Sequence, residues 1–159
     1  NKYIGRTFIS PGQDQRIDQV RIKLNPIPET VQGKRVVLID DSIVRGTTSG
    51  QIIGLLRDAG AKEVHMRVSA PPFLNPCYYG TDIDSRDHLI ACHRTIPEIA
   101  DIIGADSLGY LPTKDLCHLI GDGHFCSACF DGNYPTTVPE STQKDRFERP
   151  LSARNKEKN

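Results

Sequence analysis

The sequence predicts an α/β fold, in which a parallel β-sheet carries flanking helices. Residues 36–39 form a continuous aliphatic run, of the kind found in parallel strands that are buried on both faces. Residues 63–70 alternate in hydropathy and are followed by two prolines, which end a strand. A helical pattern lies between the two runs, so together they predict one βαβ unit with a right-handed crossover.

The helix between these strands is predicted from apolar residues at helical spacing between Ile52 and Ala59. Thr47 or Thr48 can serve as its N-cap, and Gly60 supplies the stop. The later part of the chain predicts helices over residues 85–92, 96–103 and 114–120, and a short strand over 107–111.

The chain divides into three parts. Residues 1–24 carry five basic and two acidic side chains without clear periodicity, and we expect a flexible basic arm. Residues 25–139 hold the predicted strands and helices and form the folded domain. Residues 140–159 contain six basic and four acidic side chains and almost no apolar ones, which predicts a solvated, disordered tail. The chain starts at Asn1 and its one methionine is Met66, so we expect a fragment without the natural start of its gene product.

Composition excludes several classes of protein. The 159 residues are 37% hydrophobic and 25% charged, as in ordinary soluble domains, and a chain of this size can bury a core without disulfides. Twenty basic and twenty acidic residues cancel, so nucleic acid is not an expected partner. The aliphatic runs are far shorter than the roughly 18 residues of a membrane span, so a membrane-spanning protein is excluded. Five unevenly spaced cysteines favour a reducing compartment, the cytoplasm, over a disulfide framework.

A cluster of polar residues follows the first predicted strand. Asp40 and Asp41 stand at its carboxyl end, where ligands bind in open α/β sheets. The next residues lead into the helix, whose free N–H groups and dipole favour a phosphate. The loop residues that can contact this phosphate are Ser42, Arg45, Gly46, Thr47 and Thr48. The pattern predicts a binding site that favours a phosphate.

The two acids also suggest a metal ion. Adjacent carboxylates repel one another in a dry site unless a neutral or positive group meets them. Ribose hydroxyls and a hydrated Mg²⁺ both qualify, because Mg²⁺ favours one or two carboxylates plus phosphate oxygens. The structural alternative is an Asp-Asp-Ser turn that leaves a strand and caps a helix. The chain contains neither G-x-x-x-x-G-K-[ST] nor G-x-G-x-x-G, which disfavours a Walker-type nucleotide hydrolase and a dinucleotide site.

Cys126 and Cys129 form a C-x-x-C motif, which alone fits zinc, an iron–sulfur cluster, a redox pair or two ordinary thiols. A redox motif usually opens a helix after a strand, whereas here a Phe-Asp-Gly-Asn-Tyr-Pro turn is expected, which favours metal binding. Cys77, in a loop bounded by proline, is the natural third thiol of a four-ligand site, and the fourth is undetermined. Cys92 and Cys117 fall in predicted helices, where small buried thiols are expected.

Residues 36–48 resemble the phosphoribosylpyrophosphate (PRPP) motif of type I phosphoribosyltransferases, with four hydrophobic residues, two acids and a loop of hydroxyls and glycine. The form D-D-S-I-V-R-G-T-T is similar to that of the glutamine PRPP amidotransferases, or amidophosphoribosyltransferases, and this resemblance covers residues 1–139. Further stretches that carry it are Y-I-G-R-T-F-I at 3–9, R-I-K-L-N-P at 21–26, N-P-C-Y-Y-G at 75–80, I-G-A-D-S-L at 103–108 and C-x-x-C-F-x-G-x-Y-P at 126–135.

The resemblance implies the C-terminal part of a type I phosphoribosyltransferase domain, an incomplete Rossmann-like parallel sheet. It implies an enzyme that transfers ammonia from glutamine onto PRPP, giving 5-phosphoribosylamine and pyrophosphate in the first committed step of purine synthesis. By the same resemblance, Asp40 and Asp41 hold the ribose hydroxyls and Mg²⁺, and residues 42–48 hold the 5′-phosphate. The arm becomes a loop that closes over the substrate, with Lys2 and Arg6 facing pyrophosphate.

The iron–sulfur-containing subclass of this family implies a structural [4Fe–4S] cluster on Cys77, Cys126 and Cys129, with its fourth ligand in a segment that precedes this chain. The family's glutaminase half needs an N-terminal cysteine, which Asn1 cannot supply, so we expect the fragment alone to be inactive and the missing glutaminase domain to be its partner. A homo-oligomer and inhibition by purine nucleotides are also implied. The competing functions are a base phosphoribosyltransferase, a non-catalytic regulatory protein that binds phosphoribosyl phosphates, and a zinc-binding interaction module.

Overall fold

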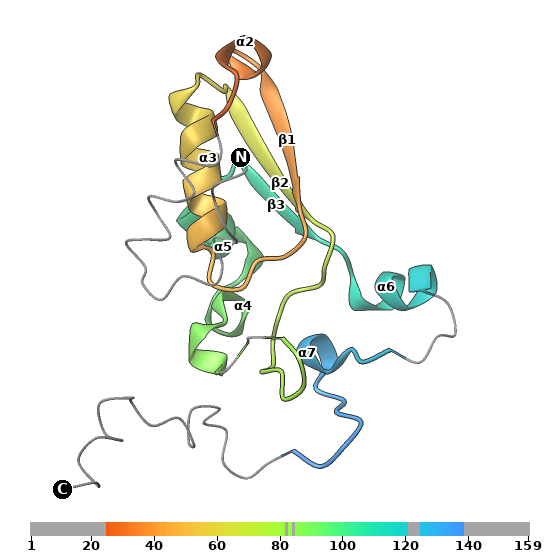
Figure 1. The fold of residues 1–159 in the computed structure, drawn as a ribbon. Coiled ribbons are helices and arrows are strands. Elements are labelled where there is room, and N and C mark those ends of the chain that lie inside the picture. The colour runs from red at the N-terminus through yellow and green to blue at the C-terminus, as the bar shows by residue number, and fades with distance from the viewer. Residues whose placement is uncertain (1–24, 82, 84, 121–124, 139–159) are drawn as a thin grey trace, which may run out of the picture.

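The computed structural model describes residues 25–81, 83, 85–120 and 125–138. Strands β1 (Arg35–Asp40), β2 (Glu63–Val68) and β3 (Ser107–Tyr110) form a parallel sheet in the order β1-β2-β3 (Figure 1). The predicted α/β class, with a parallel sheet and flanking helices, is confirmed. The expected basic arm, the expected tail, Lys2 and Arg6 lie outside the described residues.

Helices α3 (Thr47–Asp58) and α5 (Ile96–Ile103) lie on the same face of the sheet (Figure 1). The core between them and the sheet contains residues that are at most 2% exposed: Ile43, Ile53, Val64, Met66, Ile99 and Ile103. Helix α5 agrees with the predicted range and has a reciprocal capping box, in which Thr95 and Glu98 each bind the other's backbone N–H. Packing of these two helices therefore fixes the position of the segment that links β1 to α3.

The other face of the sheet is open in the described structure. Val37 and Ile39 of β1 are 61% and 74% exposed, whereas Val36 and Leu38 pack against the core. The prediction that residues 36–39 are buried on both faces is therefore wrong for the described chain, because the helices that contact the sheet pack on one side of it. An apolar run cannot distinguish these two cases, since it carries no period-2 signal.

Several element boundaries differ from the sequence predictions. The expected helix over residues 85–92 is instead a 3₁₀ turn, η2 (Arg86–His88), followed by α4 (Ile90–His93). The break lies at Leu89, which has φ −89° and ψ 106° and is 0% exposed. Burial of this side chain, together with an Ile90 N–H to Val44 O hydrogen bond of 3.0 Å, outweighs the local helical pattern. The N-cap of α3 is Gly46, not Thr47 or Thr48.

Smaller differences concern the ends and the short helices. Strands β2 and β3 end two residues and one residue before their predicted limits, and α6 (Thr113–Ile120) begins one residue earlier than predicted. The short helix α2 (Pro28–Val31) has no counterpart in the sequence prediction. As predicted, α3 ends before Gly60, whose φ is +90°. In the described part of the chain, no helix is long and apolar enough to cross a membrane.

Arg57 and Asp106 join the end of α3 to the loop before β3. Asp106 Oδ2 accepts hydrogen bonds from Val64 N–H at 2.6 Å and from Arg57 Nη2 at 2.5 Å. Arg57 also donates to the carbonyl oxygens of Lys62 and Gly104, so one guanidinium holds three backbone segments together. This contact closes the βαβ unit at the edge opposite the carboxyl ends of the strands.

We expect Asp106→Asn to lower the melting temperature at neutral pH. The Val64 N–H, and then the hydrogen bond and charge of Arg57, outweigh burial and lower the pKa of Asp106 in the folded state. A carboxyl with a lowered pKa adds stability above its unfolded pKa and loses it as the pH falls, so the difference from the unaltered protein should shrink below about pH 4. Thermal unfolding at several pH values measures this. Asp58→Asn, an exposed position at the end of α3, is the matched control, and an equal loss there would contradict the assignment.

Candidate functional site

A pocket of about 360 Å³ opens at the carboxyl end of β1. It is lined by all seven residues that the sequence assigns to substrate binding: Asp40, Asp41, Ser42, Arg45, Gly46, Thr47 and Thr48. Thr81 and Ile83 also line it, from a loop about 40 positions further along the chain, and sequence reasoning missed both. The structure thus brings the seven residues together around one cavity, and their individual roles remain predictions.

The two acids of this pocket have different surroundings. Asp40 is half-buried and its Oδ1 accepts the N–H of Asp41 at 2.9 Å, while Asp41 is exposed and accepts the Ser42 hydroxyl at 2.9 Å. Burial raises the pKa of Asp40, the Asp41 N–H opposes this rise, and the negative charge of Asp41 adds to it. A cation between the two carboxylates would relieve both the burial cost and the repulsion, so the donor set fits a hard ion such as Mg²⁺.

The start of α3 is open to an anion. Gly46 has φ +80°, and no side chain caps the first N–H groups of this twelve-residue helix. Unpaired N–H groups at a helix N-terminus, together with its dipole, favour a phosphate. Thr47 and Thr48 place hydroxyls on the first turn of the helix, and Ser42 lies at the start of the loop. The geometry therefore suits a phosphate group at the start of the helix.

Residues in and just before α4 contact the loop between β1 and α3. Ile90 N–H donates to Val44 O, and Arg45 Nη2 lies 3.5 Å from His88 Nδ1. A Cβ atom added to Gly46 would come within 3.1 Å of Ile90 Cδ1. The loop conformation is thus set by packing against α4 as well as by its own sequence.

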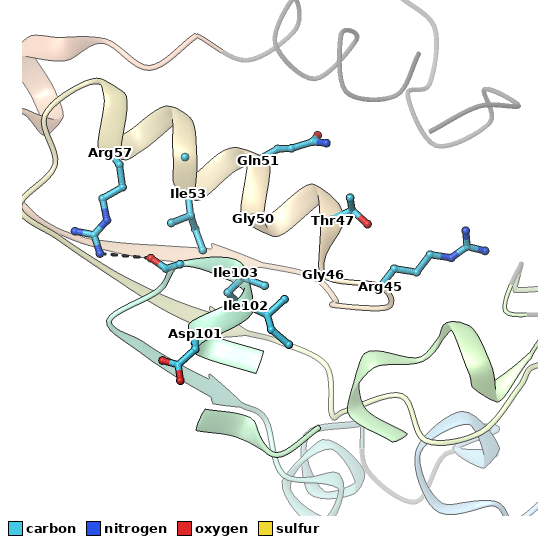
Figure 2. Close-up of a pocket in the computed structure, with 12 residues that line it drawn as sticks. Arg45, Gly46, Thr47, Gly50, Gln51, Ile53, Arg57, Asp101, Ile102 and Ile103 are labelled. Carbon is cyan, nitrogen blue, oxygen red and sulfur yellow. Dashed lines mark hydrogen bonds between the residues drawn. The ribbon is translucent and has the colours of Figure 1, made fainter. Parts of the chain in front are cut away.

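A second pocket, of about 540 Å³, lies between α3 and α5 (Figure 2). Gly50, Gly54 and Ile102 are part of its lining, and Arg57 donates to Gly104 O at one end. Neither Asp40 nor Asp41 lines this pocket. The pocket at the strand end, which gathers both acids and the loop, is therefore the candidate site.

Cys77 is 6% exposed, and its sulfur accepts hydrogen bonds from backbone N–H groups. Thr81 N–H donates to Cys77 Sγ at 3.4 Å. Burial opposes ionisation of this thiol, but hydrogen bonds from the backbone of Tyr79, Thr81 and Gly80, and from the Thr81 side chain, outweigh it and lower the pKa of Cys77 to about 7. Its surroundings therefore favour a thiolate, which is the form that binds metals.

The other two predicted thiol ligands lie near Cys77. Burial is the main cause that raises the pKa of Cys129 to about 11, and the charge and hydrogen bond of Cys77 and the charge of Cys126 add to it. Cys129 O accepts the N–H groups of Leu74 and Asn75 at 2.9 and 3.0 Å, which ties the loop before Cys77 to the C-x-x-C segment. These three cysteine side chains are free thiols. Among the described residues, no group of three or more His, Cys, Asp or Glu side chains has a ready-made metal geometry.

The backbone around the C-x-x-C motif differs from the sequence prediction. A one-turn helix, α7 (Ala128–Asp131), begins inside the C-x-x-C motif and includes the first two residues of the turn expected over residues 130–135. Asp131 accepts the Ser127 hydroxyl at 2.7 Å, and Gly132 ends the turn with φ +81°. Phe125, the described residue that directly precedes the motif, is in no strand, and residues 121–124 lie outside the described part of the chain. Cys92 is half-buried and donates to Leu74 O at 3.1 Å, and the Cys117 side chain lies outside what the structure describes.

Comparisons with known proteins show what the whole chain is similar to. No family model matches the chain. It is 52% identical to the amidophosphoribosyltransferase of Synechocystis over 149 residues, which are 92% of this chain and 30% of that protein. It is also 52% identical over 141 residues to the amidophosphoribosyltransferase of Methanothermobacter thermautotrophicus, covering 87% of this chain and 30% of that protein.

The structure of the glutamine PRPP amidotransferase from B. subtilis, solved in complex with ADP and GMP, matches with a TM-score of 0.72 and 47% identity. The match covers 89% of this chain and 32% of that chain. The present chain therefore spans about 30% of the length of the curated relatives it matches. Over most of its length, in sequence and in fold, this chain is similar to one part of the amidophosphoribosyltransferases.

Proposed function

We propose that this chain is the PRPP-binding part of an amidophosphoribosyltransferase, which transfers ammonia derived from glutamine onto PRPP. The observation that carries the proposal is the single pocket in which Asp40, Asp41 and the loop at the start of α3 meet. The identity of about 50% to proteins of this name, over most of the chain, supports it. In this assignment the product is 5-phosphoribosylamine and the leaving group is pyrophosphate, at the first committed step of purine synthesis.

In this proposal Asp40 and Asp41 hold the ribose hydroxyls and Mg²⁺, and Ser42, Arg45, Gly46, Thr47 and Thr48 hold the 5′-phosphate. A bound Mg²⁺ stabilises the negative charge that develops on departing pyrophosphate. Displacement at the anomeric carbon passes through an oxocarbenium-like state, and ammonia needs no strong base to attack it.

We assign Lys2 and Arg6 to the pyrophosphate, as cations that stabilise the same departing charge. In this assignment the basic arm closes over the substrate and excludes water, which would otherwise hydrolyse the activated sugar.

The reaction is tested in the intact enzyme that contains this chain. With PRPP, Mg²⁺ and either glutamine or ammonia, release of pyrophosphate is expected, and purine or pyrimidine bases should not replace ammonia. Turnover with a base alone would instead support a base phosphoribosyltransferase. Binding of PRPP without any turnover would support the regulatory protein, and stoichiometric zinc without PRPP binding would support the zinc module.

We propose further that Cys77, Cys126 and Cys129 are ligands of a structural [4Fe–4S] cluster, with a fourth ligand outside this chain. The lowered pKa of Cys77 and the interactions of Cys129 with Cys77 and Cys126 support this. Iron–sulfur clusters take thiolate ligands, whose sulfurs accept N–H hydrogen bonds. The same donor set would accept zinc, so the metal must be identified directly.

Intact enzyme prepared without oxygen is expected to be brown and to contain about four irons per chain. Iron and zinc analysis, together with the visible absorption spectrum, measures this. Cys126→Ser should lose the colour, whereas Cys92→Ser, at a thiol that hydrogen-bonds Leu74 O, should keep it. One zinc per chain with no iron would contradict the cluster.

Regulation, assembly and location complete the proposal. Purine nucleotides are expected inhibitors. The structure of a similar enzyme was solved in complex with ADP and GMP, which supports this expectation. We also propose a homo-oligomer and a cytoplasmic location. The free thiols of the described cysteines support a reducing compartment.

A further inference from the structure

One loop connects the cysteines to the candidate pocket. We call its described residues, 77–81 and 83, the cysteine strap. Cys77 N–H donates to Ile83 O at 2.9 Å, and Ile83 N–H donates to Thr81 O at 2.8 Å. Thr81 N–H in turn donates to Cys77 Sγ at 3.4 Å. These bonds form a closed ring in which the sulfur atom is the only side-chain group.

Residues of the cysteine strap contribute both to the candidate pocket and to a small second core. Thr81 and Ile83 line the pocket that contains Asp40 and Asp41. Ile83 is also 3% exposed in a small second core with Cys77 and Leu89, against which Val44 and Cys129 pack. Val44 is itself part of the pocket lining, and its carbonyl accepts the N–H of Ile90. The second core therefore contains residues of both the cysteine group and the pocket lining.

We propose that Thr81 and Ile83 are positioning residues of the substrate pocket, held in place by the sulfur of Cys77, so that the hydrogen bond to this sulfur affects how tightly the pocket binds PRPP. This inference rests on the proposed function. Without the sulfur acceptor, the hydrogen bond from Thr81 N–H to Cys77 Sγ is lost and the ring opens. The strap must then be ordered when the ligand binds, which lowers affinity. Because Thr81 and Ile83 line the pocket without carrying a charge or a role assigned in the reaction, binding should suffer more than turnover.

The first test measures the dissociation constant of PRPP with Mg²⁺ in the intact enzyme. Cys77→Ala is expected to raise it about tenfold, and hydrogen exchange at the amides of Thr81 and Ile83 should speed up. Cys92→Ala is the matched control, because this thiol packs on the same second core but bonds Leu74 O, and its constant should stay within twofold. An unchanged constant in Cys77→Ala overturns the inference. So does an equal rise in Cys126→Ala, which leaves the acceptor of the strap in place.

The second test leaves every thiol intact, so it remains decisive if Cys77→Ala does not fold. Ile83→Ala is expected to keep the iron content and colour, to raise KM for PRPP about fivefold and to change kcat much less, and Ile83→Val should restore most of the affinity. An unchanged KM overturns the inference. If the unaltered enzyme binds no PRPP, the proposed function fails and this inference fails with it. If it binds PRPP and neither variant weakens binding, only the inference fails.

Discussion

Asp40→Asn and Asp41→Asn, made in the intact enzyme, are each expected to lower kcat/KM for PRPP about 10- to 100-fold. Both carboxylates line the pocket at the carboxyl end of β1, and in the proposed function they hold the ribose hydroxyls and Mg²⁺. Loss of a hydrogen bond to a charged group costs about 1.5–3 kcal/mol, and every 1.4 kcal/mol is a factor of ten. Steady-state kinetics with varied PRPP and Mg²⁺ measures the effect.

The two variants differ in what else they change. Asp41 is exposed, so Asp41→Asn should leave the melting temperature almost unaltered. Asp40 is half-buried and accepts the N–H of Asp41, so Asp40→Asn also tests the start of the loop. In the proposed function glutamine is hydrolysed in the missing glutaminase domain, so glutamine hydrolysis is the internal control and should persist in both variants. Unchanged kinetics for PRPP in both would contradict the site assignment.

The strand, loop and helix of the site were predictable because their signals are local. The apolar run of β1, the polar residues from Asp40 to Thr48 and the pattern of α3 are contiguous in the sequence. Any parallel strand followed by a crossover helix brings such residues to one edge of a sheet. The seven residues assigned from this segment therefore line a single cavity.

The parts that escaped prediction depend on contacts between distant segments. Ile83 packs in the second core and Thr81 bonds the sulfur of Cys77, and no pattern in their own loop predicts that both line the pocket. The helical periodicity around Leu89 is real, yet a tertiary hydrogen bond to Val44 O and burial break the helix there. The exposure of one face of β1 was also not predicted, because the number of layers that cover a strand is a property of the whole sheet.

Gly46→Ala is expected to weaken both the fold and the site. Gly46 has φ +80°, where an L side chain costs about 1–2 kcal/mol, and a Cβ atom there would lie 3.1 Å from Ile90 Cδ1 and 3.3 Å from Ile103 Cγ2. These neighbours come from α4 and α5, and Figure 2 shows Gly46 at the start of α3, beside Ile103. The backbone must move to relieve the contacts, and it carries the N–H groups that are open to a phosphate. We expect a loss of about 2 kcal/mol in stability and a rise in KM for PRPP of at least about tenfold.

Gly54→Ala is the matched control on the same helix. A Cβ atom at Gly54 would meet no other atom within 4 Å, and alanine favours a helix interior over glycine by about 0.5–1 kcal/mol. Gly54→Ala should therefore raise the melting temperature slightly and leave KM for PRPP unchanged. Denaturation and PRPP kinetics on both variants separate the two contributions. If Gly46→Ala loses stability but binds PRPP normally, the helix start does not hold the phosphate, because moving its N–H groups would then have no effect on the ligand.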